Sequence, residues 1–233
     1  MLARGLVGSR SEAENWIRLG RVRVGGRAAT KPGLFVDESA PIELAASERY
    51  VSRAGLKLAG ATKAFNLNFR GKTVLDVGSS TGGFTDFALQ HDANKVYAVD
   101  VGTDQLHPSL RGNKRIELYE KTDIRYFVPS EIPDIVVIDV SFISLRQILP
   151  HVAKIVDKNT TIVAMVKPQF EAQRQQLTRG GIVKNDGVRR AILREFEQWA
   201  RANFIIINKA DSEVKGAHGN LERFYILRKA GSC

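Results

Sequence analysis

The stretch that decides the fold is LDVGSSTGGFTD, residues 75–86. The apolar run KTVLDVG leads into it, and FTDFALQ, which has the composition of a short helix, follows it. A glycine-rich loop between a strand and a helix lies at the carboxyl edge of an α/β sheet, where such folds bind their ligands. The glycines Gly78, Gly82 and Gly83 therefore predict a tight loop that approaches a ligand closely.

The chain from residue 53 onward alternates apolar runs with segments that suit helices. Runs such as DIVVID and TIVAMV are typical of strands that are buried on both faces. This alternation predicts an α/β fold, a Rossmann-like parallel sheet flanked by helices. We expect helices near 82–91 and 187–202, and strands near 73–77, 96–100, 116–119, 134–139, 161–166, 203–208 and 223–228.

The beginning of the chain has a different character and predicts a small α+β domain. SRSEAENWIRLG favours a helix, RVRVGGRAAT a strand and hairpin, and KPGLFVDESAPIELA two more short strands. The composition changes again near AASERYVS, where we place a linker over residues 46–52. The predicted domains are therefore residues 1–45 and 53–233.

Charge and cysteine content limit the classes of function. The formal net charge is +10, which favours a polyanionic partner, either nucleic acid or an acidic membrane surface. The single cysteine, Cys233, can build neither a disulfide framework nor a cysteine zinc site, and we predict no metal. A reducing, cytoplasmic location is the natural interpretation. No segment reaches the ~18 apolar residues of a membrane span.

The glycine loop is not a phosphate-binding loop of either common type. No Gly-Lys-Ser/Thr follows it, and its glycine spacing differs from G-x-G-x-x-G. Asp76 would repel a pyrophosphate but suits a ligand that carries an amine. Asp100 ends the next strand and can accept both hydroxyls of a ribose. S-adenosylmethionine, an amino acid joined to a nucleoside without phosphate, meets these constraints. The alternative is that the glycines only allow a tight turn and that Asp76 caps the helix.

Two features that the sequence lacks limit the kinds of atom that can accept the methyl group. The stretch IDVSF has no proline, unlike the motif of exocyclic amine methylation, and Cys233 is poorly placed as a nucleophile for carbon methylation. A hydroxyl acceptor needs a positioned base, and a lysine can act so when burial or a cation lowers its pKa. Lys167 follows the fifth strand and Asp139 ends the fourth, so both point toward the edge of the glycine loop. The alternatives are a solvated lysine and a helix-capping aspartate.

Several segments together resemble the TlyA or haemolysin A family of ribosomal RNA 2′-O-methyltransferases, whose catalytic half is similar to FtsJ-type ribose methyltransferases. They run across nearly the whole chain and are SRSEAENWIRLGRVRVGG, YVSRAGLKL, LDVGSSTGGFTD, VYAVDVGTDQL, IDVSFISL, MVKPQFE, RGGIVKNDGVRR and HGNLERF. The first of them resembles an S-four-type RNA-binding module. The resemblance implies a ribosomal RNA partner, with cytidine as the modified nucleotide.

The resemblance also implies site residues that spacing alone does not select. The implied catalytic set is Lys57, Asp139, Lys167 and Glu222, in which Lys167 takes the ribose proton, Lys57 helps to keep Lys167 neutral, and the two carboxylates hold the ammonium groups. Three features depart from the family pattern: a first helix shortened at MLARGLVGSR, Asp123 in place of the more common Asn, and Arg223 in place of an aromatic. The predicted cofactor-binding residues are Asp76, Gly78, Ser80, Thr81, Gly82, Gly83, Phe84, Asp100, Asp123 and Asp139.

The basic residues of the first domain are the predicted RNA contacts. Residues 1–31 carry seven basic side chains against two acidic ones. With one residue of the catalytic domain, the set is Arg4, Arg10, Arg18, Arg21, Arg23, Arg27, Lys31 and Arg53. We expect a monomer that does not insert into membranes. Two other functions stay open: a non-catalytic ribosome-binding protein and a membrane-active haemolysin.

Overall fold

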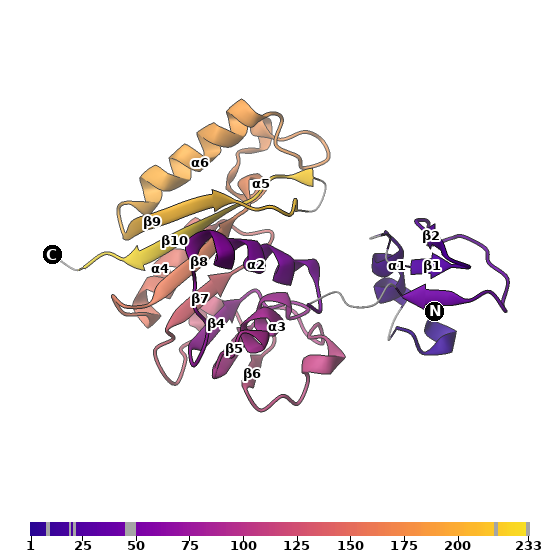
Figure 1. Cartoon of the computed structure of the whole chain (residues 1–233). Helices are drawn as coiled ribbons and strands as arrows, with labels where there is room; N and C mark the ends of the chain where they lie inside the picture. Colours follow the sequence, from indigo (N-terminus) through magenta and orange to yellow (C-terminus); the bar gives the residue numbers. More distant parts are fainter. Residues whose placement is uncertain (8–9, 19, 21, 45–49, 217–218, 232–233) are drawn as a thin grey trace. The chain divides into compact units, whose positions relative to one another are not determined.

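The computed structural model describes residues 1–7, 10–18, 20, 22–44, 50–216 and 219–231. It divides into two compact units, Met1–Glu48 and Arg49–Cys233, each with its own sheet (Figure 1). The predicted linker, residues 46–52, spans this division, and its residues 46–49 lie outside the described part.

The described residues of the N-terminal unit form an α-helix, a short 3₁₀ helix and a three-stranded antiparallel sheet in the order β2-β1-β3. Gly25 and Gly26 both have positive φ, 56° and 77°, as the two-residue turn of a tight hairpin requires. The hairpin predicted in RVRVGGRAAT is thus confirmed. The elements of this unit are η1 Leu2–Arg4, α1 Arg10–Arg18, β1 Val22–Val24, β2 Arg27–Ala29 and β3 Ile42–Leu44.

One strand prediction in this unit is wrong. Residues 31–45 were expected to form two strands, but β3 is the only strand among the described residues 31–44. The apolar residues Leu34, Phe35 and Val36 are exposed in a loop, and Phe35 is 100% exposed. The loop is held by local turns instead, in which the Asp37 carboxylate accepts hydrogen bonds from the backbone and hydroxyl of Ser39. An apolar run alone does not make a strand where Pro and Gly punctuate it.

The second unit is built on a seven-stranded sheet in the order β6-β5-β4-β7-β8-β10-β9. The five strands from β6 to β8 in this order are parallel, as predicted for an α/β fold. The chain runs outward from β4 to β6 and then returns to β7 on the other side of β4, so a topological switch point lies between β4 and β7. The strands are β4 Thr73–Val77, β5 Lys95–Val99, β6 Ile116–Tyr119, β7 Ile135–Ile138, β8 Thr161–Val166, β9 Phe204–Asp211 and β10 Arg223–Lys229.

One strand runs against the others, which the expectation of a parallel sheet did not include. β10 pairs antiparallel with both β8 and β9. Only residues 212–222 connect β9 to β10, and a parallel pair would need a crossover, usually a helix. The reversal brings the amino end of β10 to the carboxyl end of β8. It therefore adds residues from the C-terminal part of the chain to the ligand-binding edge.

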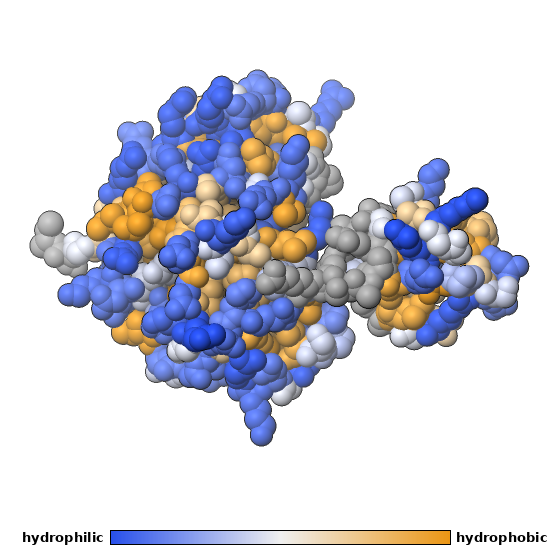
Figure 2. Space-filling model, viewed as in Figure 1, coloured by the Kyte–Doolittle hydropathy of each residue, from blue (hydrophilic) through white to orange (hydrophobic). Residues whose placement is uncertain are grey.

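Helices cover both faces of the sheet (Figure 1). Alternate residues of β4 face opposite layers: Val74 packs with α2 and α3, and Leu75 and Val77 pack with α4 and α6. Burial of each such side chain contributes about 1.5–3 kcal/mol. The outer face of α6 is largely hydrophilic (Figure 2). The helices are α2 Arg53–Phe65, α3 Gly83–Gln90, α4 Leu145–Ile155, the short α5 Pro168–Glu171 and α6 Asp186–Ala200.

Candidate active site

A cavity of about 510 Å³ opens at the carboxyl edge of β4, β5 and β7, at the switch point. Its size lies within the range of small-molecule sites, roughly 300–1,000 Å³. Apolar walls are formed by Val77, Val99, Ile124 and Ile148. Five of the predicted cofactor-binding residues also line it, namely Gly78, Ser80, Asp100, Asp123 and Asp139.

The glycine loop adopts a backbone that side chains would prevent. Gly78 has φ 82°, and a Cβ atom there would lie 2.7 Å from the carbonyl oxygen of Asp139. Gly82 has φ 89°, and a Cβ atom there would lie 2.6 Å from Leu110. Ser80 also has positive φ, 47°, and its N–H donates to Oδ2 of Asp100 at 2.8 Å. The loop is thereby held close to the ends of both β5 and β7.

Asp100 and Asp123 both face the cavity, and both already accept hydrogen bonds. Asp100 Oδ1 accepts from the Gly102 N–H at 2.7 Å, so each of its oxygens has one backbone donor and one lone pair to spare. Asp123 caps the short helix η3, Ile124–Tyr126. The Arg125 guanidinium contacts both oxygens of Asp123 and lowers the pKa of that carboxyl.

The other five predicted cofactor residues lie outside the cavity wall. Asp76 is fully buried on the α3 side of the sheet, where Oδ2 accepts from the Thr85 hydroxyl at 2.6 Å. Burial raises the pKa of Asp76 to about 7, and Oδ1 has no hydrogen-bond partner in the described part of the chain. Asp76 does not line the cavity, and its contact with the amine of a ligand stays a prediction. The remaining four, which shape the turn and the start of α3, are Thr81, Gly82, Gly83 and Phe84.

The four predicted catalytic residues form two ion pairs at the same edge of the sheet. Lys57 Nζ, from α2, lies 2.5 Å from Oε2 of Glu222, and Lys167 Nζ lies 2.7 Å from Oδ1 of Asp139. The side chains are between 2% and 15% exposed. Arg223 pairs with Val166 across β10 and β8, so the preceding Glu222 lies opposite the following Lys167. The reversed strand thus brings the two pairs together.

Further residues hold the segments that carry these pairs, and sequence reasoning missed them. Lys167 Nζ also donates to the Ser141 hydroxyl at 2.8 Å. Glu171, in α5, accepts from the Ser144 hydroxyl at 2.6 Å and from the Leu145 N–H at 2.7 Å, so it ties α5 to the start of α4. Burial raises the pKa of Glu171. Glu171 stands in MVKPQFE, four residues after Lys167, and that proximity was the available signal.

The loop after β7 also carries an aromatic side chain that sequence reasoning missed. Phe142 is 91% exposed, has φ 65°, and lies with its ring centroid 5.2 Å from that of Phe170. Positive φ is uncommon for a bulky residue and concentrates at functional sites. No sequence signal marked this position beyond its place beside Asp139.

On the far side of β10, arginines hold the segment before Glu222. The guanidinium of Arg189 is buried, binds the Leu221 carbonyl at 3.0 Å and pairs with Asp211. Arg223 binds the same carboxylate at 2.6 Å. These contacts fix the backbone on both sides of Glu222.

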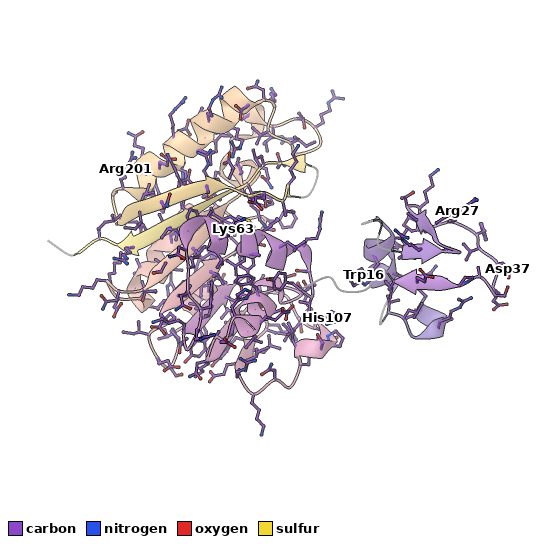
Figure 3. The ribbon with its side chains drawn as sticks, viewed as in Figure 1. Trp16, Arg27, Asp37, Lys63, His107 and Arg201 are labelled. Carbon is purple, nitrogen blue, oxygen red and sulfur yellow. The ribbon has the colours of Figure 1, made fainter. Side chains whose placement is uncertain are left out.

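The predicted RNA contacts are placed in different ways. In the N-terminal unit, Arg10, Arg23, Arg27 and Lys31 are exposed, and Arg27 lies on its surface (Figure 3). Arg4 is not free, because its guanidinium donates to the carbonyls of Ala40 and Glu38. Arg53 is exposed at the start of α2. The Arg18 side chain and Arg21 lie outside the described residues.

Known families match both units. Residues 50–230 match the FtsJ-like methyltransferases, and residues 1–42 match the S4 domain. The chain belongs to the FtsJ-like methyltransferase family. As an FtsJ-like methyltransferase it uses S-adenosylmethionine, and the cavity fits this cofactor, since it combines apolar walls with the carboxylate of Asp100. Among the described residues, no helix is long and apolar enough to cross a membrane.

Relatives confirm the resemblance to the TlyA and haemolysin A proteins. A protein named Hemolysin A from Brachyspira hyodysenteriae is 40% identical over 223 residues, which cover 94% of this chain and 93% of its own. The Mycobacterium tuberculosis protein named 16S/23S rRNA (cytidine-2'-O)-methyltransferase TlyA is 38% identical over 234 residues, which cover 98% of this chain and 87% of its own. A solved haemolysin-named structure from Streptococcus thermophilus has a TM-score of 0.80 at 40% identity, covering 97% of this chain and 85% of its own.

Proposed function

We propose that this methyltransferase transfers the methyl group of S-adenosylmethionine to a ribose 2′-hydroxyl of ribosomal RNA, with cytidine as the modified nucleotide. The observation that carries the proposal is the pair of lysine–carboxylate contacts beside the cofactor-sized cavity. Asp139 links the cavity to one of these ion pairs, since it lines the cavity and also pairs with Lys167. A hydroxyl brought to Lys167 therefore lies next to the cofactor.

The cofactor supplies an electrophilic methyl group on a sulfonium sulfur. In its neutral amine form, Lys167 accepts the proton of the ribose 2′-hydroxyl as the new oxygen–carbon bond forms and the sulfur–carbon bond breaks. Asp139 and Ser141 fix the position of the Lys167 nitrogen. Lys57 and Glu222 form the second pair and complete the site. Alignment of the methyl group with the oxygen supplies much of the rate.

The cofactor contacts follow from the cavity wall. In the proposal Asp100 accepts the ribose hydroxyls of the cofactor, because each of its oxygens keeps a free lone pair. Asp123 accepts the adenine amine, and the loop at Gly78 and Ser80 lies against the rest of the cofactor. Asp76 supports the loop from behind, through Thr85.

The partner in this proposal is ribosomal RNA within ribosomal subunits, and the N-terminal unit is the RNA-binding module. The match to the S4 domain and the exposed basic side chains Arg23, Arg27 and Lys31 support this part. We propose a monomer that acts in the cytoplasm, where ribosomal subunits are assembled. Light scattering of the pure protein tests the monomer.

Mapping of ribose methylation tests the proposal. Unmodified small- and large-subunit ribosomal RNA is incubated with the protein and S-adenosylmethionine, and methylated nucleotides are located by mass spectrometry. The expected product is a 2′-O-methylcytidine that the Lys167→Ala variant does not form. Cofactor binding in calorimetry without any RNA methylation would favour a non-catalytic RNA-binding protein. Leakage of liposomes by the pure protein would favour the haemolysin.

A further inference from the structure

A basic hairpin, defined here as residues 172–184, lies between α5 and α6. Its tip is a turn in which the Gly181 N–H donates to the Thr178 carbonyl at 3.1 Å and the Thr178 N–H donates to the Ile182 carbonyl at 2.8 Å. Leu177 and Val183 form an antiparallel bridge. The hairpin is therefore an ordered projection with defined backbone pairing.

The basic hairpin carries three cations that have no partner among the described residues. Arg174, Arg179 and Lys184 are all exposed, and no hydrogen bond or ion pair links their side chains to the described residues. No Asp or Glu occurs between residues 172 and 184. Elsewhere in this unit arginines such as Arg189 and Arg223 are engaged by carboxylates. The hairpin thus presents net positive charge that nothing in the described chain neutralises.

A buried amide anchors the hairpin to the segment that carries Glu222. Asn220 is 5% exposed, and its Oδ1 accepts from the Val183 N–H at 3.1 Å. Its Nδ2 donates to the Gly181 carbonyl at 3.3 Å. A small cavity of about 200 Å³ is lined both by Ile182 and Val183 of the hairpin and by Pro168 and Leu221. Pro168 directly follows Lys167, and Leu221 directly precedes Glu222. The hairpin is therefore fixed beside both catalytic ion pairs.

Two further free cations lie near the same edge. Lys215 is exposed next to Gly216, which packs against the Glu222 carboxylate. Arg53 is exposed one turn before Lys57 on α2. Neither side chain forms a hydrogen bond or an ion pair with the described residues. The hairpin and Lys215 thus border the catalytic edge on its β8–β10 side, and Arg53 lies at the start of α2, which packs against Gly83 of the glycine loop.

We propose that the basic hairpin is the RNA-docking surface of the catalytic domain and that Arg174, Arg179 and Lys184 bind the phosphates that flank the target nucleotide. The inference rests on the proposed function, since RNA is the substrate there. Phosphate contacts fix the position of a strand without reading its sequence. An ordered hairpin fixed to Glu222 can align the strand with Lys167, which a mobile charged loop cannot do. Exposed, unpaired arginines suit phosphate oxygens, because their planar fork binds them in pairs.

A charge-matched pair of triple variants tests this. The hairpin variant is Arg174→Gln, Arg179→Gln and Lys184→Gln. The control variant is Lys114→Gln, Lys154→Gln and Lys158→Gln, which removes the same charge from exposed residues near the opposite edge of the sheet. RNA binding is measured against salt concentration with unmodified ribosomal RNA, and KM for that RNA and kcat are measured with each protein.

The hairpin variant should lose about 2–3 units of the salt slope, roughly 0.7–0.9 for each lost phosphate contact. Its KM for RNA should rise on the order of tenfold or more, while the control should change by less than about twofold. Cofactor affinity should not change in either protein. Equal salt slopes and equal KM values in the two variants would overturn the proposal. So would an effect confined to binding of anionic vesicles.

A third variant distinguishes the effect of the hairpin's charge from the effect of its structure. Arg174→Lys with Arg179→Lys keeps every charge, so most of the salt slope should return even where the arginine fork is lost. A slope as low as that of the glutamine variant would show that the hairpin acts through its structure and would overturn the phosphate contacts. Failure of the proposed function is distinguishable, because the wild type would then methylate no RNA while the binding difference between the two triple variants persisted.

Discussion

The catalytic edge and the basic hairpin beside it use cationic side chains in opposite ways. Lys57 and Lys167 are each 11% exposed and are paired with a carboxylate within 2.7 Å. Arg174, Arg179 and Lys184 are exposed and meet no carboxylate in the described structure. A cation that the fold already neutralises is fixed in place and can position a reacting group. A cation that the fold leaves free is available to an external anion, and here that anion is RNA phosphate.

The largest effect should follow from removing Lys167, the paired lysine that accepts the proton in the proposed reaction. Lys167→Ala should lower kcat by roughly 10²–10⁴-fold, the usual scale for an acid–base group. Cofactor affinity should stay close to that of the wild type, because Lys167 does not line the cavity. Single-turnover methylation and calorimetry measure the two quantities. Lys158→Ala, an exposed lysine at the other edge of the sheet, is the matched control. Wild-type turnover in Lys167→Ala would remove the residue from the mechanism.

The second prediction concerns the ion pair of Lys57 with Glu222 and distinguishes its contribution to stability from its role in catalysis. Glu222→Ala leaves the Lys57 ammonium buried without its carboxylate, which should cost about 3 kcal/mol of the free energy of unfolding. Denaturant titration measures it. The double variant Lys57→Met with Glu222→Leu should recover most of that stability without recovering activity, because an apolar pair of similar volume removes the unpaired charge. Recovery of activity as well would show that this pair is only structural.

Features that depend on residues close together in the sequence could be predicted, and features that depend on residues far apart in the sequence could not. The strands of the sheet and the loop at Gly78 were predicted because apolar runs and turn glycines are local signals. The reversal of β10 depends on the connection from residue 212 to 222, which carries no strong local pattern. The pair Lys57–Glu222 joins residues 165 positions apart, so only the family resemblance selected it.

Side-chain orientation was the other limit. Asp76 stands between Leu75 and Val77, which face the α4 and α6 layer, so the period of two residues along a strand places Asp76 on the opposite face. That rule was available from the sequence, whereas the pairing with Thr85 was not. Arg4 was selected by its charge alone, and nothing in the sequence shows that backbone carbonyls engage its guanidinium.

The third prediction follows from the burial of the Asp76 carboxyl. Because burial raises the pKa of Asp76 to about 7 from 3.8, the folded state binds a proton that the unfolded state releases between these values. Stability is therefore lost as pH rises through this window. Asp76→Asn cannot ionise, so its stability relative to the wild type should improve by about 2–3 kcal/mol between pH 5 and pH 8. Urea titrations at both pH values measure this. A difference that does not depend on pH would show that Asp76 is not buried as described.

The carboxylate of Asp100, which lines the cavity, gives the fourth prediction. Asp100→Ala should weaken S-adenosylmethionine binding by about 1.5–3 kcal/mol, the scale of a hydrogen bond to a charged group. Asp100→Asn should lose less, because an amide oxygen still accepts one hydrogen bond. Calorimetry measures both dissociation constants. Asp104→Ala is the control, since this exposed carboxylate belongs to the same segment but not to the cavity wall. An unchanged affinity in Asp100→Ala would place the cofactor ribose elsewhere.

The smallest effect should come from the N-terminal unit, in which backbone carbonyls hold one arginine while other arginines are exposed. Arg23 and Arg27 are exposed on β1 and β2, whereas Arg4 is held by the carbonyls of Ala40 and Glu38. The double variant Arg23→Gln with Arg27→Gln should therefore reduce the salt slope of RNA binding by about 1–2 units, at roughly 0.7–0.9 per contact. Arg4→Gln should leave that slope almost unchanged and instead loosen the loop at residues 38–40, since its hydrogen bonds to that loop are lost. Salt titration measures the first effect, and hydrogen exchange of the loop amides measures the second. The contrary result would be that Arg4→Gln reduces the slope as much as the double variant does. Hydrogen bonds within the fold would then not predict which arginines bind RNA. The contrast between the catalytic edge and the basic hairpin would in that case lose its physical basis.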